Sequence, residues 1–171
     1  MTSIIKVDTL QKANGATPTA ADLGINTTGN VIQVVTYTDA SVSVFTTSSS
    51  GYVTSDSLPR ATITPKFSNS KILIQAMVGM QNDQTGQIEN TIYRTTGGTA
   101  TDLSGNNTYG LAFKGVNTGT FWTECSITWA DSPNTTNSVE YKWYSRSEHG
   151  NNVTPCHHGT SISMTIMEIA Q

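Results

Sequence analysis

The chain has 171 residues, of which 36% are hydrophobic and 12% are charged, and its formal net charge is −3. This length suits one domain with an appendage, and the charge balance gives no electrostatic reason to expect nucleic acid as a partner. The sequence has no run of about 18 to 20 apolar residues, so we expect no membrane insertion, and we expect no secretory leader. Serine, threonine and asparagine rather than charges make the chain polar, which is typical of β-rich extracellular or virion proteins.

The first thirty residues differ from the rest of the chain. Residues 3–10 have the pattern of a short strand, and residues 17–24 have that of a brief helix with Thr17 as N-cap and Pro18 in its first turn. A segment this small buries no core of its own, so it must lie on another surface if it is ordered. We therefore predict that residues 1–30 are an attachment arm. Its candidate contact residues are the apolar ones, Ile4, Ile5, Val7, Leu10, Leu23 and Ile25.

From residue 31 onward the hydrophobic pattern has a period of two, which indicates strands. The clearest strand is 71–80, where Ile72, Ile74, Ala76 and Val78 fall on one face. The other extended segments, separated by turn residues, are 31–37, 41–46, 52–53, 61–64, 87–94, 109–113, 121–129, 139–146 and 161–169.

Three of these segments have informative faces. In 121–129, Cys125 and Ile127 share a face with Trp129, whereas Trp122 and Glu124 lie on the other, and in 139–146 Tyr141 and Trp143 point the same way. The last segment alternates through Ile162, Met164 and Ile166 until Met167 breaks the phase. This break predicts a bulge or a sheet edge near Met167.

About eight or nine short strands without helical periodicity predict an all-β fold, an antiparallel β-sandwich over residues 31–171. A jelly-roll-like topology is favoured over a barrel. Few of the strands carry the lysines or prolines that protect an exposed edge, so we expect the protein to associate with copies of itself.

Two cysteines and a pair of histidines are the possible metal ligands. We interpret Cys125 and Cys156 as small packing thiols, and a disulfide between them is the alternative. On a strand Cys156 and His158 point the same way and His157 points away, so a weak metal candidate is Cys156 with His158, repeated about a trimer axis. The simpler interpretation is a loop whose imidazoles bond to backbone or water, and we expect no cofactor.

An enzyme that cleaves surface polysaccharide would need two carboxylates about 5 to 10 Å apart. Asp83, Glu89 and Glu124 are candidates, but acids scattered along a chain form such pairs by chance. Neither a G-x-S-x-G nor an H-E-x-x-H pattern is present. We therefore predict a protein without catalytic residues.

Exposed aromatic residues and one charged strand face are the other candidate contact sites. The side chains of Glu140, Lys142 and Arg146 share a face, either for ion pairs between subunits or as an ordinary solvated surface. Four aromatic residues are suited either to stacking on sugars or to packing between strands and subunits. They are Tyr93, Tyr109, Trp122 and Tyr144.

Several motifs resemble those of virion structural proteins of tailed phages of aquatic bacteria, especially cyanophages, which include tail-fibre and minor structural proteins. The resemblance implies a β-sandwich head, commonly a homotrimer, tethered to the particle by an N-terminal segment. The motifs that carry it are residues 3–11, 20–35, 45–47, 50–53, 63–65, 70–74 and 165–169.

The sequence is therefore interpreted as a non-enzymatic virion protein, assembled in the host cytoplasm. The favoured form is a short tail fibre that docks through its arm on other virion proteins and presents a trimeric head to a host surface glycan. The alternative is a capsid-bound head fibre or decoration protein that stabilises the shell or adheres weakly to hosts. A free carbohydrate-binding module of a cellular enzyme fits less well, because nothing resembles a catalytic neighbour.

Overall fold

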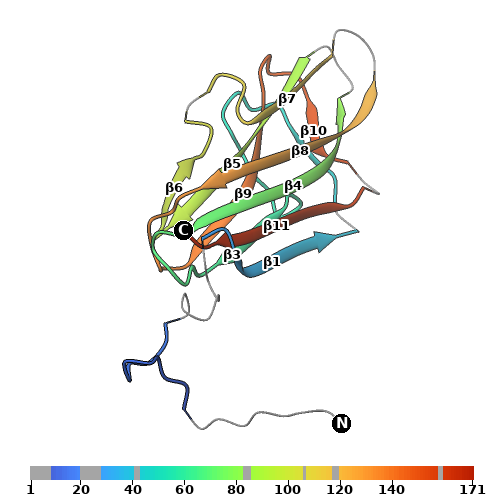
Figure 1. The fold of residues 1–171 in the computed structure, drawn as a ribbon. Helices are drawn as coiled ribbons and strands as arrows, with labels where there is room; N and C mark the ends of the chain where they lie inside the picture. The colour runs from blue at the N-terminus through green and yellow to red at the C-terminus, as the bar shows by residue number, and fades with distance from the viewer. Residues whose placement is uncertain are drawn as a thin grey trace, which may run out of the picture.

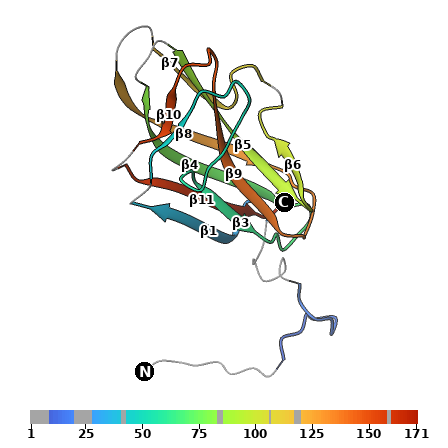
Figure 2. The ribbon, with the colours of Figure 1, turned by 180° about the vertical axis from the view of Figure 1, so that it is seen from behind.

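The computed structural model describes residues 9–19, 28–40, 43–82, 86–105, 107–116, 120–157 and 160–171. The described residues form eleven strands in two antiparallel sheets that pack as a sandwich, and they contain no helix (Figures 1 and 2). Sheet A consists of β1 (Val31–Asp39), β2 (Phe45–Thr47), β4 (Lys71–Asn82), β8 (Phe121–Asp131), β10 (Val153–Cys156) and β11 (Ile162–Ile169). Sheet B consists of β3 (Arg60–Ile63), β5 (Gly86–Thr96), β6 (Thr99–Asp102), β7 (Ala112–Val116) and β9 (Val139–Ser147). The predicted all-β antiparallel sandwich is confirmed.

The strand order explains why eleven strands agree with a prediction of eight or nine. β10 and β11 lie one after the other along the same edge of β4, β2 and β1 pair with them in turn, and β6 and β7 share one edge of β5. The eleven strands therefore fill eight positions. Numbered along the chain, these positions run first, eighth, third, sixth in sheet A and second, seventh, fourth, fifth in sheet B. This is the strand order of a jelly roll, as predicted.

The core lies between the sheets and follows the predicted alternation. On β4 the side chains of Ile72, Ile74, Ala76 and Val78 are all buried, and β9 contributes the fully buried Trp143. Burial of one large apolar side chain stabilises the fold by about 1.5–3 kcal/mol, so a slip of one residue along β4 would remove several such contributions at once.

The prediction for the last strand was wrong in one respect. β11 lies between β1 and β4, so it has no free edge, and its alternation continues past Met167 because Glu168 takes the next buried position. The register shift is instead in β1, between Val31 and Gln33, opposite the end of β11. A carboxylate at a core position therefore resembled a break in the apolar pattern.

Glu168 holds a loop to the last strand through a buried hydrogen-bond network. Its Oε1 accepts the hydroxyl of Ser70 at 2.7 Å and the backbone N–H groups of Lys66 and Phe67 at 2.8 and 3.2 Å, and its Oε2 accepts Nε2 of Gln33 at 2.5 Å. Burial acts to raise the pKa of the carboxyl, but these hydrogen bonds outweigh burial and hold that pKa below its usual range. The network fixes residues 64–70 against the end of sheet A where β1 begins.

A second network lies between the sheets around Asn90. Its Oδ1 accepts Nε1 of Trp143 at 3.1 Å and the hydroxyl of Ser145 at 2.8 Å, and all three side chains are fully buried. Nearby on β8, Asp131 accepts the hydroxyl of Tyr141 at 2.8 Å. These bonds satisfy the polar groups that an antiparallel sandwich would otherwise leave unpaired in its core.

The arm meets the sandwich at the C-terminal end of the chain. The N–H of Gly29 donates to the carbonyl of Ala170 at 2.8 Å, and the N–H of Ala170 donates to the carbonyl of Asn30 at 2.9 Å. Residues 9–19 lie apart from the sandwich in Figures 1 and 2, and Leu10 is half exposed. The helix expected at 17–24 falls largely outside the described residues, as do five predicted arm contacts: Ile4, Ile5, Val7, Leu23 and Ile25.

Candidate functional site

A groove lies at the end of sheet A that is farthest from the arm. On β4 the residue nearest the arm is Lys71, which faces Ile169, whereas Gln81 at the other end faces Trp122 of β8. The groove has a volume of about 800 Å³, within the range of small-ligand pockets. Its lining residues come from β4, β8 and the segment after β10: Gly79, Met80, Trp122, Thr123, Glu124, His157 and Thr160.

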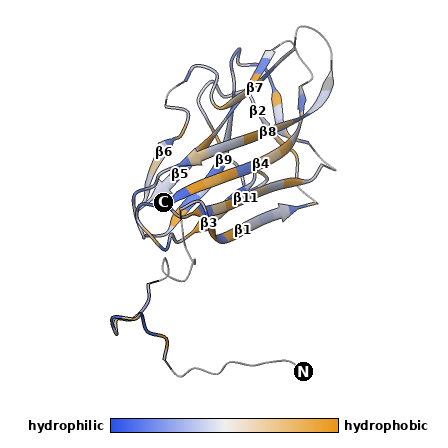
Figure 3. Ribbon diagram, in the orientation of Figure 1, coloured by the Kyte–Doolittle hydropathy of each residue, from blue (hydrophilic) through white to orange (hydrophobic). Residues whose placement is uncertain are grey.

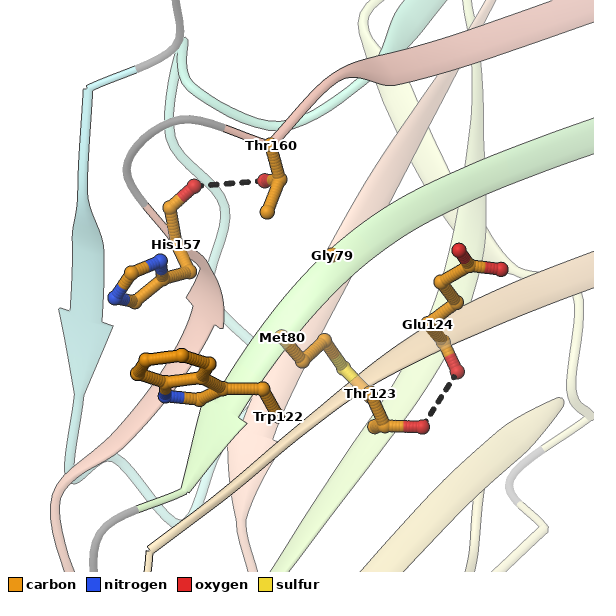
Figure 4. Close-up of a pocket in the computed structure, with 7 residues that line it drawn as sticks. All are labelled: Gly79, Met80, Trp122, Thr123, Glu124, His157 and Thr160. Carbon is orange, nitrogen blue, oxygen red and sulfur yellow. Dashed lines mark hydrogen bonds between the residues drawn. The ribbon is translucent and has the colours of Figure 1, made fainter.

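Trp122 is the most exposed aromatic residue of the groove. It points outward from β8, the strand that pairs with β4 in sheet A, and 72% of its surface is exposed to solvent. The imidazole of His157 lies beside the indole, with ring centroids 5.5 Å apart and planes inclined by 33° (Figure 4). The backbone fixes the histidine, because its N–H donates to the carbonyl of Gly79 at 3.0 Å and its carbonyl accepts the hydroxyl of Thr160 at 2.7 Å. These bonds fix the backbone of His157 beside the indole of Trp122.

Gly79 makes room for this arrangement. A Cβ atom at that position would lie 2.5 Å from Cγ2 of Thr160, so a side chain there would displace the segment that carries His157. Across the sheet the residue opposite Gly79 is Glu124, whose side chain is exposed. The groove therefore combines an aromatic wall, a backbone floor and one carboxylate (Figure 4).

This arrangement suits binding by stacking and hydrogen bonding. Glu124 is the one carboxylate among the lining residues, and two are needed for glycoside hydrolysis. Of the other acids considered from the sequence, Glu89 lies on the outer face of sheet B, opposite to that of Glu124, and Asp83 is outside the described residues. The absence of enzymatic activity stays a prediction.

A second aromatic cluster occupies the outer face of sheet B. The rings of Tyr93 and Tyr144 lie 4.2 Å apart, Tyr52 meets Tyr93 edge-on at 6.3 Å, and the guanidinium of Arg146 lies 4.6 Å from the Tyr52 ring. Burial raises the pKa of Tyr52 to about 12. A small pocket of about 330 Å³ opens beside this cluster.

The charged face predicted on β9 forms ion pairs within the chain. Nε of Arg146 donates to the fully buried Glu89 at 2.5 Å, and Nζ of Lys142 lies 3.9 Å from the exposed Asp56. The Arg146 pair is partly buried and also anchors a loop through the carbonyl of Thr108. Arg146 thus already has a partner in its own subunit.

The four predicted aromatic contacts occupy three places. Tyr93 and Tyr144 pack together, Trp122 forms the groove, and Tyr109 stacks on Phe113 at 5.0 Å with both rings about half exposed. The strand expected from residue 109 begins instead at Ala112, because a turn precedes it. Tyr52, Gly79, His157 and Thr160 were not identified as groove or cluster residues from the sequence. The available signal was Gly79, since a glycine within a strand indicates a close approach of other atoms.

The cysteines are free packing thiols, as interpreted from the sequence. Cys125 is 5% exposed and Cys156 fully buried, and burial raises the pKa of each thiol to about 11. The alternative of a disulfide was wrong. His158 of the weak metal candidate lies outside the described residues, and the described part of the chain has no group of three or more His, Cys, Asp or Glu placed to hold a metal ion.

Comparisons with known proteins give little guidance. No protein-family model matches the sequence, and no curated protein sequence matches it significantly. Among the solved structures, a chain from the infectious bursal disease virus Gx strain aligns with a TM-score of 0.41 and 14% identity, over 81% of this chain and 42% of that one. The protein therefore spans less than half the length of the viral chain, and so distant a likeness carries no argument about function.

No helix in the described ranges has the length and hydropathy needed to span a membrane.

Proposed function

We propose that the protein is a structural component of a phage virion, a short tail fibre whose residues 1–30 dock on the particle. The jelly roll projects outward and presents the groove at Trp122 to a host surface. The observation that carries the proposal is the polarity of the domain. The arm enters beside Ala170, next to the start of β1, and the groove lies ten residues farther along β4, about 34 Å away at ~3.4 Å per residue.

The sequence resemblance supports the same orientation. The motifs at residues 3–11 and 20–35 lie in the arm and at its junction with β1, and the closing motif at 165–169 lies in β11 beside that junction. The jelly roll occurs both in viral capsid and in lectin domains, so the fold agrees with the proposal without selecting it.

The groove suits a pyranose ring. The exposed indole of Trp122 supplies a flat apolar surface for the C–H face of a sugar, and the carboxylate of Glu124, on the same face of β8, supplies a hydrogen-bonding group for its edge. One such site gives weak binding. A homotrimer engages three at once, and avidity then raises the overall affinity without further contacts.

Deletion of residues 1–25 is expected to give a soluble, folded protein that no longer joins the particle. The described part of this segment makes local backbone bonds, whereas the strand pairing begins with Gly29 and Asn30. Circular dichroism and size-exclusion chromatography test the fold, and immunoblotting of purified virions tests incorporation. An unfolded product would make the segment part of the domain and contradict the arm.

Copy number separates the proposed fibre from the alternative capsid location. A few dozen copies per particle or fewer, by quantitative mass spectrometry of virions, would agree with a tail fibre. Hundreds of copies would identify a decoration or head protein instead. Absence from virions would reject both.

Replacing Trp122 with alanine is expected to reduce adsorption of virions to host cells at least tenfold. The indole is 72% exposed, so the melting temperature should change by less than about 2 °C. Tyr109→Ala is the matched control, because it removes an exposed aromatic ring that does not line the groove. Equal adsorption by the Trp122→Ala and unmodified particles would remove the groove from the proposal.

A further inference from the structure

The outer face of sheet A carries three registered rows of side chains without a charge. Across β1, β11, β4 and β8 the strands pair residue by residue, so side chains from four strands stand in line. The first row is apolar, namely Val34, Met167, Leu73 and Ala130. The second row is Thr36, Thr165, Gln75 and Thr128, and the third is Thr38, Ser163, Met77 and Ser126.

These side chains point away from the core. Their strand neighbours Ile74, Ile127 and Ile166 are buried, whereas Val34 is 54% exposed. Figure 1 looks onto this face, with the four strands side by side, and the hydrophobic colour of β4 in Figure 3 combines its outward residues with its core residues. Between its second and third rows is a shallow depression of about 320 Å³.

The two outer faces of the sandwich differ in charge. Sheet B carries Glu89 paired with Arg146, and Lys142 near Asp56, on its outer face. The three rows of sheet A contain no Asp, Glu, Lys or Arg, and the charges on this outer face, Lys71 and Glu124, lie beyond the two ends of the rows. The surfaces of soluble proteins normally carry charges throughout, and these charges keep molecules apart. An uncharged flat region of this extent therefore indicates a surface that another molecule covers.

We propose that this face is the surface through which copies of the chain associate, with the apolar row of Val34, Leu73 and Met167 at its centre. This inference names the contact of the oligomer that is part of the proposed function and rests on it to that extent. An uncharged face carries no charge pattern that a different protein could complement. Interfaces between identical subunits are also more apolar than those between different proteins. Copies arranged around a common axis that this face lines bring their uncharged rows together, so the rows place no like charges in contact.

The position of the face agrees with this occupant. Val34 lies on the first strand after the arm, so copies arranged in parallel around an axis beside the apolar row bring their arms together at one end of the assembly. The grooves at Trp122 then lie at the other end, which is the arrangement that multivalent binding requires.

The area of the three rows is enough for the centre of an interface but not for a whole one. Four strands about 4.8 Å apart and three rows about 6.8 Å apart cover roughly 400 Å², about half of the ~800 Å² per partner in a standard interface. The next row toward the arm, Val31, Ile169 and Lys71, lies outside this area and is available as part of that rim, with Val31 half exposed.

The test is the oligomeric state of the full-length protein by sedimentation equilibrium. The unmodified protein is expected to be an oligomer at micromolar concentration, and the double variant Val34→Lys/Thr128→Lys a monomer, with at least a hundredfold weaker association. Both positions are exposed, so the fold should be retained. Thr62→Lys, at an exposed position on the outer face of sheet B, is the matched control and should leave association unchanged.

Methionine oxidation of the unmodified protein gives a second readout that does not depend on a variant folding. Met77 and Met167 point outward from the proposed face, whereas Met80 and Met164 are buried in the core. Dilution below the dissociation constant should therefore speed peroxide oxidation of the first pair and leave the second pair unchanged.

Three results would overturn the proposal. The first is that the unmodified protein is monomeric at tens of micromolar, and the second is that the double variant still associates. The third is that Met77 and Met167 are shielded from oxidation only within purified particles, which would mean that another virion protein covers the face. A monomeric protein would also remove the trimer from the proposed function, whereas the virion location is tested separately by copy number. If the protein associates through this face but is absent from virions, the proposed function is rejected and the proposed interface is retained.

Discussion

Replacing Glu168 with alanine is expected to lower the free energy of unfolding by about 3–5 kcal/mol, the cost of removing the acceptor of a buried, charge-assisted hydrogen-bond network. The carboxylate is fully buried and accepts hydrogen bonds from Ser70, Gln33 and two backbone amides. Its removal leaves the buried hydroxyl of Ser70 without this acceptor and releases residues 64–70 from β11. In a domain of this size the change corresponds to a decrease in melting temperature of roughly 6–20 °C.

The same carboxylate makes stability depend on pH in a defined direction. Hydrogen bonding holds the pKa of Glu168 below its usual range in the folded protein, so the unfolded chain binds this proton more readily. The stabilisation is fully present above the unfolded pKa of about 4.3 and is lost as the pH falls through the lower folded pKa. Glu168→Gln should therefore flatten the decrease in stability that the unmodified protein shows below about pH 4.5.

Urea unfolding at pH 7 and at pH 3.5 measures both effects. Glu124→Gln is the matched control, because it makes the same chemical change at an exposed carboxylate. The difference in stability between Glu168→Gln and the unmodified protein should shrink as the pH falls, whereas the control should follow the unmodified protein. A difference independent of pH would show that folding does not lower the pKa of Glu168.

The Glu168 network also shows where sequence reasoning succeeds. The fold class followed from the sequence because strands buried on one face repeat with period two, as Ile72, Ile74 and Ala76 do on β4 and as Tyr141 and Trp143 do on β9. Period alone locates a buried position without giving the residue type it holds. Glu168 occupies a core position of β11, and its partners lie about a hundred residues earlier in the chain, so the sequence indicated a broken strand where the structure has a continuous one.

The groove was harder to predict from the sequence for the same reason. Trp122 was identified as an exposed aromatic residue from its phase on the strand, but its neighbour His157 depends on the pairing of β10 with β4. That pairing is a long-range contact, which local periodicity does not encode. Gly79 fell within the predicted strand 71–80 without a role of its own, although its missing side chain is what makes room for Thr160.

Gly110→Ala is expected to be the most damaging single methyl addition in the described part of the chain, with a loss of about 2–5 kcal/mol. The residue has a φ of +68°, a conformation that costs an L-residue about 1–2 kcal/mol. An added Cβ would also lie 2.4 Å from the carbonyl oxygen of Asn90 and 2.5 Å from the hydroxyl of Tyr52. Steric overlap of this kind adds roughly 1–3 kcal/mol.

The obstruction is rigid on the side of Asn90. The carbonyl of Asn90 accepts the N–H of Leu111 at 2.8 Å, and the Asn90 side chain is held in the core by Trp143 and Ser145. Asn90 therefore cannot move away from the new methyl group without breaking the network that joins β5 to β9. The loop that carries Gly110 would have to move instead, which strains the hydrogen bond between the N–H of Leu111 and the carbonyl of Asn90.

Gly105→Ala separates the two contributions. Gly105 has nearly the same φ, +64°, but an added Cβ would meet no atom within 4 Å. It should lose only the conformational cost of about 1–2 kcal/mol, so the difference between the two variants in urea unfolding measures the steric part alone. Equal losses in the two variants would mean that Asn90 yields to the methyl group and that the core network is softer than its hydrogen bonds imply. If Gly110→Ala does not fold while Gly105→Ala does, the close approach at Asn90 is a requirement of the fold itself.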